Sequence, residues 1–110
     1  MSGGVGYRPS DALMRLVFDR VGMGLRAWQM VTFVHEWAMC EAELGEPPGI
    51  ERFGAWSPGS TRNAYRHLAQ FREAFKELGP SATPSDLIVW PRGYPTREAV
   101  DSIEWRAVTA

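Results

Sequence analysis

The chain has 110 residues, a formal net charge of −1, 45% hydrophobic residues and 23% charged residues. This composition is average for a folded soluble protein and excludes general disorder, and the length suits one domain. No apolar run approaches the roughly 18 residues of a membrane-spanning helix, and the glycine-rich start lacks the features of a signal peptide. We therefore expect a cytoplasmic protein with no membrane contact.

Cysteine content and charge limit which kinds of site and partner the protein can have. Cys40 is the one cysteine, which excludes an intramolecular disulfide and a zinc site built from paired thiolates, and its apolar neighbours predict a buried, inert thiol. The net charge argues against a nucleic-acid binder, because such proteins are commonly basic. Residues 35–49, however, hold four glutamates and no Lys or Arg, whereas residues 50–80 hold five cations against three anions. The more basic segment leaves DNA binding open.

The N-terminal part predicts a flexible end followed by a helix. Residues 1–9 show no periodicity and are expected to be flexible, and residues 10–110 are expected to form a single domain. Ser10 is the expected N-cap of a helix over residues 10–22. The apolar positions of this helix recur at helical spacing, at Leu13, Leu16, Val17 and Val21.

The segment Leu25–Leu44 predicts a long central helix. It contains no Gly or Pro, and its apolar residues cover more than one face, as in the central helix of a bundle. His35 lies on an apolar line and is interpreted as a core histidine. The last turns are acidic through Glu41 and Glu43, which opposes the helix dipole. Two interpretations stay open: this end keeps a nearby surface away from phosphate, or it binds a cationic or protein partner.

Two further helices are expected after this segment. Ile50, Phe53 and Trp56 at three-residue steps predict a two-turn helix over about 49–56, and the residues that follow it form a turn by composition. A longer helix is expected over about 60–78, ended by Gly79 and Pro80. Its apolar positions are Ala64, Tyr65, Leu68, Phe71, Phe75 and Leu78.

The last third of the chain carries weaker signals. Leu87–Trp90 is β-prone and predicts a short strand before a turn. From Thr96 the chain fits a helix, which we favour, although Ile103, Trp105 and Ala107 also alternate as in a strand. Residues 85–108 could form a wing that contacts DNA, but a strand that only packs is the favoured interpretation.

These elements predict a mainly α fold. We expect a single small helical domain of four or five helices, with a short C-terminal strand or hairpin as an option. The expected core consists of Leu16, Leu25, Trp28, Val31, Phe53, Tyr65, Leu68, Phe71 and Phe75.

One stretch, residues 51–68, has a specific pattern of small and apolar residues. Ala55 is small, Gly59 follows four residues later, and apolar Tyr65 and Leu68 stand six and nine residues beyond that glycine. The stretch resembles the helix-turn-helix of bacterial and phage regulators, in which two helices cross closely and the turn often needs positive φ. Gly54 departs from that pattern, because the family usually carries a large apolar residue there.

The resemblance implies sequence-specific binding of double-stranded DNA by a small transcriptional regulator, with the motif at about 49–78. It implies that Ser60–Glu77 is the recognition helix, whose outward Arg, Asn and Gln side chains would contact base edges. The helix N-terminus would hold a phosphate, and the last two cations would contact the DNA backbone. One such helix reads few base pairs, so a homodimer is expected. The DNA-binding residues are then Ser60, Thr61, Arg62, Asn63, Arg66, His67, Gln70, Arg72 and Lys76.

An enzyme is not indicated. The sequence has no HExxH motif, no phosphate-binding glycine loop and no nucleophile motif, so we expect no catalytic residues, metal or cofactor. The alternative function is a small helical module that binds another protein and modulates or inhibits it. Five tryptophans support this alternative, because Trp that cannot fit into the core is often found at protein interfaces.

Overall fold

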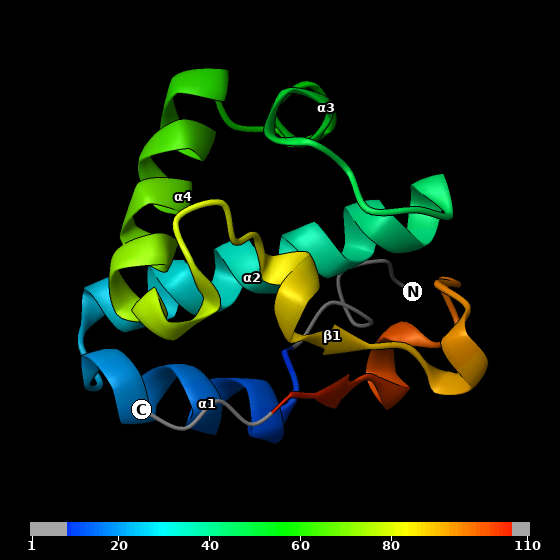
Figure 1. The fold of residues 1–110 in the computed structure, drawn as a ribbon, viewed down its shortest axis with the longest axis horizontal. Helices are drawn as coiled ribbons and strands as arrows, with labels where there is room; N and C mark the ends of the chain where they lie inside the picture. Colours follow the sequence, from blue (N-terminus) through cyan, green and yellow to red (C-terminus); the bar gives the residue numbers. More distant parts are fainter. Residues whose placement is uncertain (1–8, 107–110) are drawn as a thin grey trace.

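The computed structural model describes residues 9–106 and confirms a small, mainly helical domain. Helix α2 (Leu25–Leu44) runs through the middle of the molecule. Helix α1 (Asp11–Val21) lies on one side of it, and α3 (Ile50–Trp56) and α4 (Thr61–Ala74) lie on the other (Figure 1). The first three helices have the predicted bounds to within one residue.

Helix α2 is central because it is apolar around most of its circumference. Of its 20 residues, 12 are buried, against α1 on one side and against α3, α4 and the C-terminal segment on the others. Trp37, fully buried, stacks on Phe53 of α3 with ring centroids 4.9 Å apart. Gly45 ends the helix with a left-handed φ of 77°, as expected for a C-terminal glycine.

Helices α1 and α4 both begin at a serine cap. Ser10 Oγ accepts a hydrogen bond from Leu13 N (3.2 Å), and Ser60 Oγ accepts one from Asn63 N (3.1 Å). Helix α4 ends at Ala74, before the predicted end, because Phe75 leaves the helical region at φ −119°, ψ 52°. The chain then continues as a short 3₁₀ helix, η2 (Lys76–Leu78). The prediction of one helix over 60–78 was therefore too long by its last turn.

The core contains most of the predicted residues, with three exceptions. Leu25 is 75% exposed, and Trp28 and Tyr65 are each 46% exposed, so these three predictions were wrong. Ala27 and Ala64, next to Trp28 and Tyr65, are buried in their place, whereas both neighbours of Leu25 are exposed. Leu16 is partly buried against the core, and the remaining predicted residues, all fully packed, are Val31, Phe53, Leu68, Phe71 and Phe75.

The C-terminal part forms a strand pair rather than the favoured helix. Strand β1 (Ile88–Val89) pairs antiparallel with β2 (Glu104–Trp105), Ile88 opposite Trp105. Three 3₁₀ helices flank the pair: η3 (Pro84–Leu87), η4 (Pro91–Gly93) and η5 (Val100–Ser102). The helix from Thr96 is therefore wrong, and the alternation through Ile103 was the correct signal. Ala107 and the expected flexible end, apart from Pro9, lie outside the described residues.

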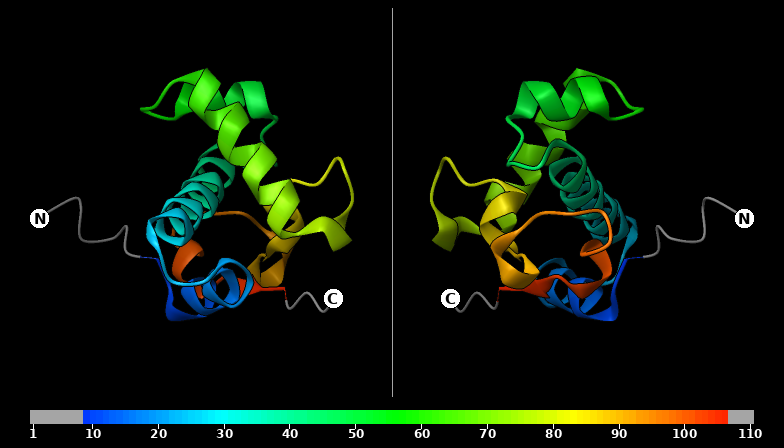
Figure 2. Two further views of the ribbon diagram at one scale, coloured as in Figure 1. Left: turned by 90° about the vertical axis from the view of Figure 1, so that its left-hand side faces the viewer. Right: turned by 90° about the vertical axis from the view of Figure 1, so that its right-hand side faces the viewer.

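This C-terminal segment packs on α2. Trp90, Val100 and Ile103 are buried in one cluster with residues of the second half of α2. Figure 2 shows the strand pair beside α1, at the end of the molecule opposite α3 and the start of α4. The segment therefore has the packing role that the sequence favoured over a wing.

A buried glutamate fastens the same segment to α2. Glu41 is 4% exposed and accepts hydrogen bonds from Ser85 Oγ and Trp90 Nε1, both 2.6 Å long. Ser85 Oγ in turn accepts one from Trp37 Nε1 (2.8 Å). The sequence interpretation that placed Glu41 on an acidic partner surface is thus corrected, because this carboxylate is buried and bonded to Ser85 and Trp90.

Candidate nucleic-acid interface

Helices α3 and α4 cross steeply and touch at a glycine. Figure 1 shows α3 end-on while α4 runs down the page beside it. A Cβ on Gly54 would lie 3.1 Å from both Cγ2 and Oγ1 of Thr61. Gly54, not Ala55, is therefore the small residue at the crossing, and Ala55 is exposed. The small residue at the helix contact is therefore one position earlier than predicted, and a large side chain at position 54 would collide with Thr61.

The turn between these helices is built differently from the expectation. Gly59 is not one of the described glycines with positive φ. Instead, Ser57 ends α3 in an extended conformation, and its Oγ accepts a hydrogen bond from Gly59 N (3.2 Å). The predicted need for a left-handed glycine at this turn was wrong, because the serine side chain satisfies the turn's N–H group.

The inward face of α4 consists of Ala64, Leu68 and Phe71. This face turns Tyr65 outward, which places it beside the predicted DNA-binding side chains instead of under them.

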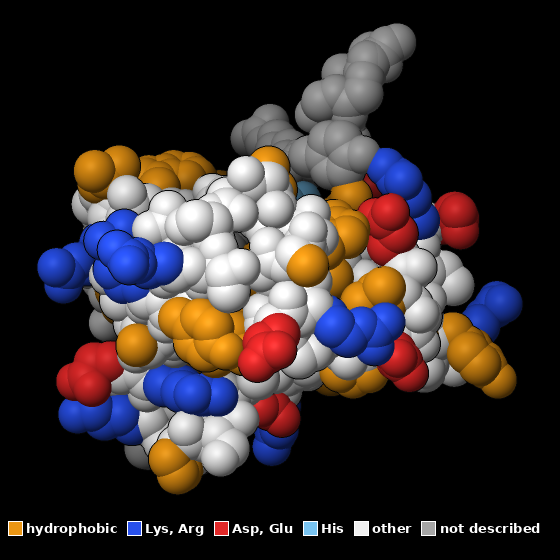
Figure 3. Space-filling model, turned by 90° about the horizontal axis from the view of Figure 1, so that it is seen from above, with side chains coloured by type: hydrophobic (Ala, Val, Ile, Leu, Met, Phe, Trp, Pro, Cys, Tyr) orange, Lys and Arg blue, Asp and Glu red, His pale blue; other side chains and the backbone are white. Residues whose placement is uncertain are grey.

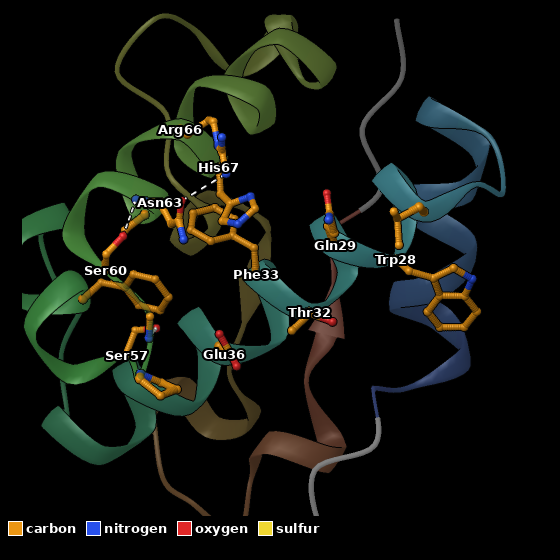
Figure 4. A pocket seen from close by; sticks show the side chains of 15 residues that line it. Trp28, Gln29, Thr32, Phe33, Glu36, Ser57, Ser60, Asn63, Arg66 and His67 are labelled. Carbon is orange, nitrogen blue, oxygen red and sulfur yellow. Dashed lines mark hydrogen bonds between the residues drawn. The ribbon is translucent and has the colours of Figure 1, made fainter.

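Three of the predicted DNA-binding residues share one exposed surface of α4. Arg62, Asn63 and Arg66 are all exposed, and the two arginines are one helical turn apart. Arg66 Nη2 donates to Asn63 Oδ1 (3.0 Å), as the dashed line in Figure 4 shows. Gln70 lies one turn further along and is half-buried. The exposed Ser60 and Thr61 open the helix at the same end.

The other predicted residues do not join this surface. Arg72 is half-buried, and its Nε donates to Ala82 O (2.8 Å), which holds the loop after α4. Lys76 lies beyond α4 and pairs with Glu73 at 3.2 Å. His67 is half-buried and faces α2, where its ring lies 5.6 Å from the ring of Phe33.

Charge on this side of the molecule is mixed. In Figure 3, which looks onto the end that carries α3 and the start of α4, Lys and Arg side chains are interspersed with acidic and apolar ones. The exposed acidic residues at the end of α2 are tied to α3: Glu43 accepts from Trp56 Nε1 (3.0 Å), and Glu46 pairs with Arg52 (2.7 Å). A broad basic surface is therefore absent from the face in view.

A polar stripe on α2, which the sequence analysis did not single out, lies beside α4. Gln29, Thr32 and Glu36 follow one another at steps of three and four and line a cleft of 540 Å³ with the start of α4. The signal was available, because these are polar residues at helical spacing within an otherwise apolar helix.

The titratable groups nearest the core show the effect of burial. Burial raises the pKa of the Cys40 thiol to about 11 and lowers the pKa of His35. Cys40 therefore stays protonated near neutral pH, as the sequence predicted for an inert thiol. Within residues 9–106 no three His, Cys, Asp or Glu side chains gather as metal ligands, and no helix is both long and apolar enough to span a bilayer.

Comparison of the chain with known proteins found no relative. No protein-family model, no curated protein and no solved structure matches the chain.

Proposed function

We propose that the protein binds double-stranded DNA through α3 and α4, with α4 as the recognition helix of a small bacterial or phage transcriptional regulator in the cytoplasm. The observation that carries the proposal is the exposed surface of Arg62, Asn63 and Arg66 on a helix that crosses its predecessor at Gly54. The steep crossing is the arrangement that lets a second helix enter the major groove while the first spans the DNA backbone.

The chemistry of this surface supports base recognition. An arginine can donate two hydrogen bonds to guanine, and an asparagine can pair with adenine. The N-terminus of α4, capped by Ser60, is a position where the helix dipole and the backbone N–H groups favour a phosphate oxygen. Because a single helix reads few base pairs and the net charge of −1 gives little general attraction, we propose a homodimer on the DNA.

A test replaces both arginines, Arg62→Ala with Arg66→Ala. DNA sequences are first selected from a random oligonucleotide pool, and affinity is then measured by fluorescence anisotropy. We expect a loss of about 1–3 kcal/mol for each bidentate base contact removed, with reduced base preference. Urea unfolding should barely change, because both side chains are exposed.

The matched control removes two arginines elsewhere, Arg15→Ala with Arg106→Ala. Both are exposed and outside the proposed interface, and the change in net charge is the same. The proposal fails if the pool yields no preferred sequence, or if both double variants lose affinity equally.

A second candidate function is favoured by a different observation. Met23, just before α2, and Leu25 and Trp28, in its first turn, are 77%, 75% and 46% exposed. Large apolar side chains exposed together are typical of protein-binding surfaces. Under this alternative the protein binds and modulates another protein, Leu25→Ser weakens that complex, and the Arg62 and Arg66 substitutions leave it intact.

A further inference from the structure

A cleft runs along the outer side of α2. Beside the hollow of 540 Å³ next to α4 lies a second one of 360 Å³, next to α3. Both are lined by Thr32, Glu36 and Pro58, so the two hollows meet at these residues. Figure 4 shows Thr32 and Glu36 on α2 across the gap from Ser57 and Asn63. The size is in the range of small-ligand sites, roughly 300–1,000 Å³.

Glu36 stands at the centre of this cleft without a partner. It is half-buried, yet it makes no hydrogen bond or ion pair within the described residues. The other glutamates of α2 differ: Glu41 is bonded to Ser85 and Trp90, and Glu43 to Trp56. Burial raises the pKa of Glu36, which means that the fold disfavours its charge. An unpaired, partly dehydrated carboxylate is unfavourable unless a cation completes it.

The walls around Glu36 are aromatic and polar, and they do not supply that cation. Trp56, which is half-buried, lines the cleft from α3, next to the buried Phe53. Arg66 and Arg97 also line it, but neither pairs with Glu36. Glu43, at the far end, adds a second negative charge. Among the described residues, therefore, none pairs with the Glu36 carboxylate.

We propose that this cleft binds an organic cation, a guanidinium or primary ammonium group on a short apolar stem, with the charge against Glu36 and the stem along Trp56. A carboxylate can accept two parallel hydrogen bonds from a guanidinium, and aromatic faces attract both apolar stems and cations. A bare metal ion does not fit, because Mg²⁺ or Ca²⁺ needs several oxygen ligands and no such group exists among residues 9–106.

Such a cation has two sources, a free amine or the basic side chain of a protein. The test titrates the full chain, labelled with ¹⁵N, with agmatine in one arm and with N-acetyl-Leu-Arg-Leu-amide in the other, and follows the amide signals in NMR. We expect saturable shifts at Thr32, Ser57 and Asn63 with at least one probe. Saturation with agmatine assigns a free amine, and saturation with the peptide alone assigns a protein side chain.

Matched variants decide whether Glu36 is responsible. Glu36→Gln, which keeps the shape and removes the charge, should weaken binding about tenfold or more. Glu51→Gln, on an exposed position of α3 outside the cleft, should leave it unchanged. Urea unfolding confirms that both variants are folded. The proposal is overturned if neither probe saturates by about 10 mM, or if Glu36→Gln binds as tightly as the parent chain. No DNA enters this test, so its outcome is independent of the proposed DNA binding.

Discussion

Glu41 receives its two short hydrogen bonds from Ser85 and Trp90, which lie 44 and 49 residues further along the chain. Glu36, five residues earlier on the same helix, points to a different side and has no partner within residues 9–106. Both appear in the sequence as members of one acidic run. Their roles could not be separated from that pattern, because the groups that distinguish them are distant in sequence.

The buried role of Glu41 gives a prediction for stability. Glu41→Ala leaves the Trp90 indole N–H and the Ser85 hydroxyl without their acceptor, so we expect the free energy of unfolding to fall by about 2–4 kcal/mol. Glu43→Ala is the control, because Glu43 is exposed and makes one hydrogen bond to Trp56; its loss should stay within about 1 kcal/mol. Urea titration followed by tryptophan fluorescence measures both. Equal losses would show that the Glu41 network does not stabilise the fold.

At the scale of elements, periodicity predicted α1, α2 and α3 closely but not how α3 and α4 meet. Gly54 and Ala55 are both small, and Ala64 and Tyr65 both suit an apolar line. The sequence does not show which residue of each pair faces the other helix. In the structure Gly54 faces α4, because Thr61 lies against it. Helix bounds are local properties, whereas a crossing point depends on two elements at once.

The strand pair illustrates the same limit. Ile103 and Trp105 fit both a helix and a strand pattern. Their conformation is decided by pairing with β1, where Trp105 lies opposite Ile88, and by burial of Ile103 near α2. Short segments with two compatible periodicities are determined by non-local partners.

The crossing at Gly54 can be tested with a pair of neighbouring variants. Gly54→Ala gains up to about 1 kcal/mol of helix propensity, but its methyl group would press on Thr61 at 3.1 Å, and overpacking costs about 1–3 kcal/mol. We expect a net loss of about 1 kcal/mol. Ala55→Gln, at an exposed position, should change stability by less than about 0.5 kcal/mol. Thermal and urea unfolding measure both, and a more stable Gly54→Ala would mean that the helices are not in tight contact there.

At the scale of the whole molecule, α2 separates two regions. Helix α3 and the start of α4 lie at one end, and α1 with the strand pair lies at the other (Figure 2). The sequence located the exposed arginines of α4, because an amphipathic helix reveals its outer face. It did not locate the cleft, since that space exists only where the polar stripe of α2 meets the turn after α3. Sites made by one element are therefore more predictable than sites made by three.

Stability as a function of pH is a property of the whole molecule to which His35 contributes. Its pKa is lowered from 6.5, chiefly by burial, with partial opposition from the charge of Asp101. The unfolded chain therefore binds a proton near pH 6.5 that the folded chain does not, so the free energy of unfolding decreases as the pH falls below that value. The raised pKa of Glu36 acts in the opposite direction at lower pH, because the fold binds its proton first.

Replacing His35 should remove its share of this acid sensitivity. For His35→Gln we expect a smaller drop in the free energy of unfolding between about pH 7 and pH 5 than for the parent chain, because glutamine does not titrate. The His67→Gln variant is the control, since it removes the other of the two histidines, which packs against Phe33 next to α4. Urea titrations at several pH values measure the three proteins. If the parent chain and His35→Gln lose the same free energy over this interval, the buried His35 does not govern the acid limb of the stability curve.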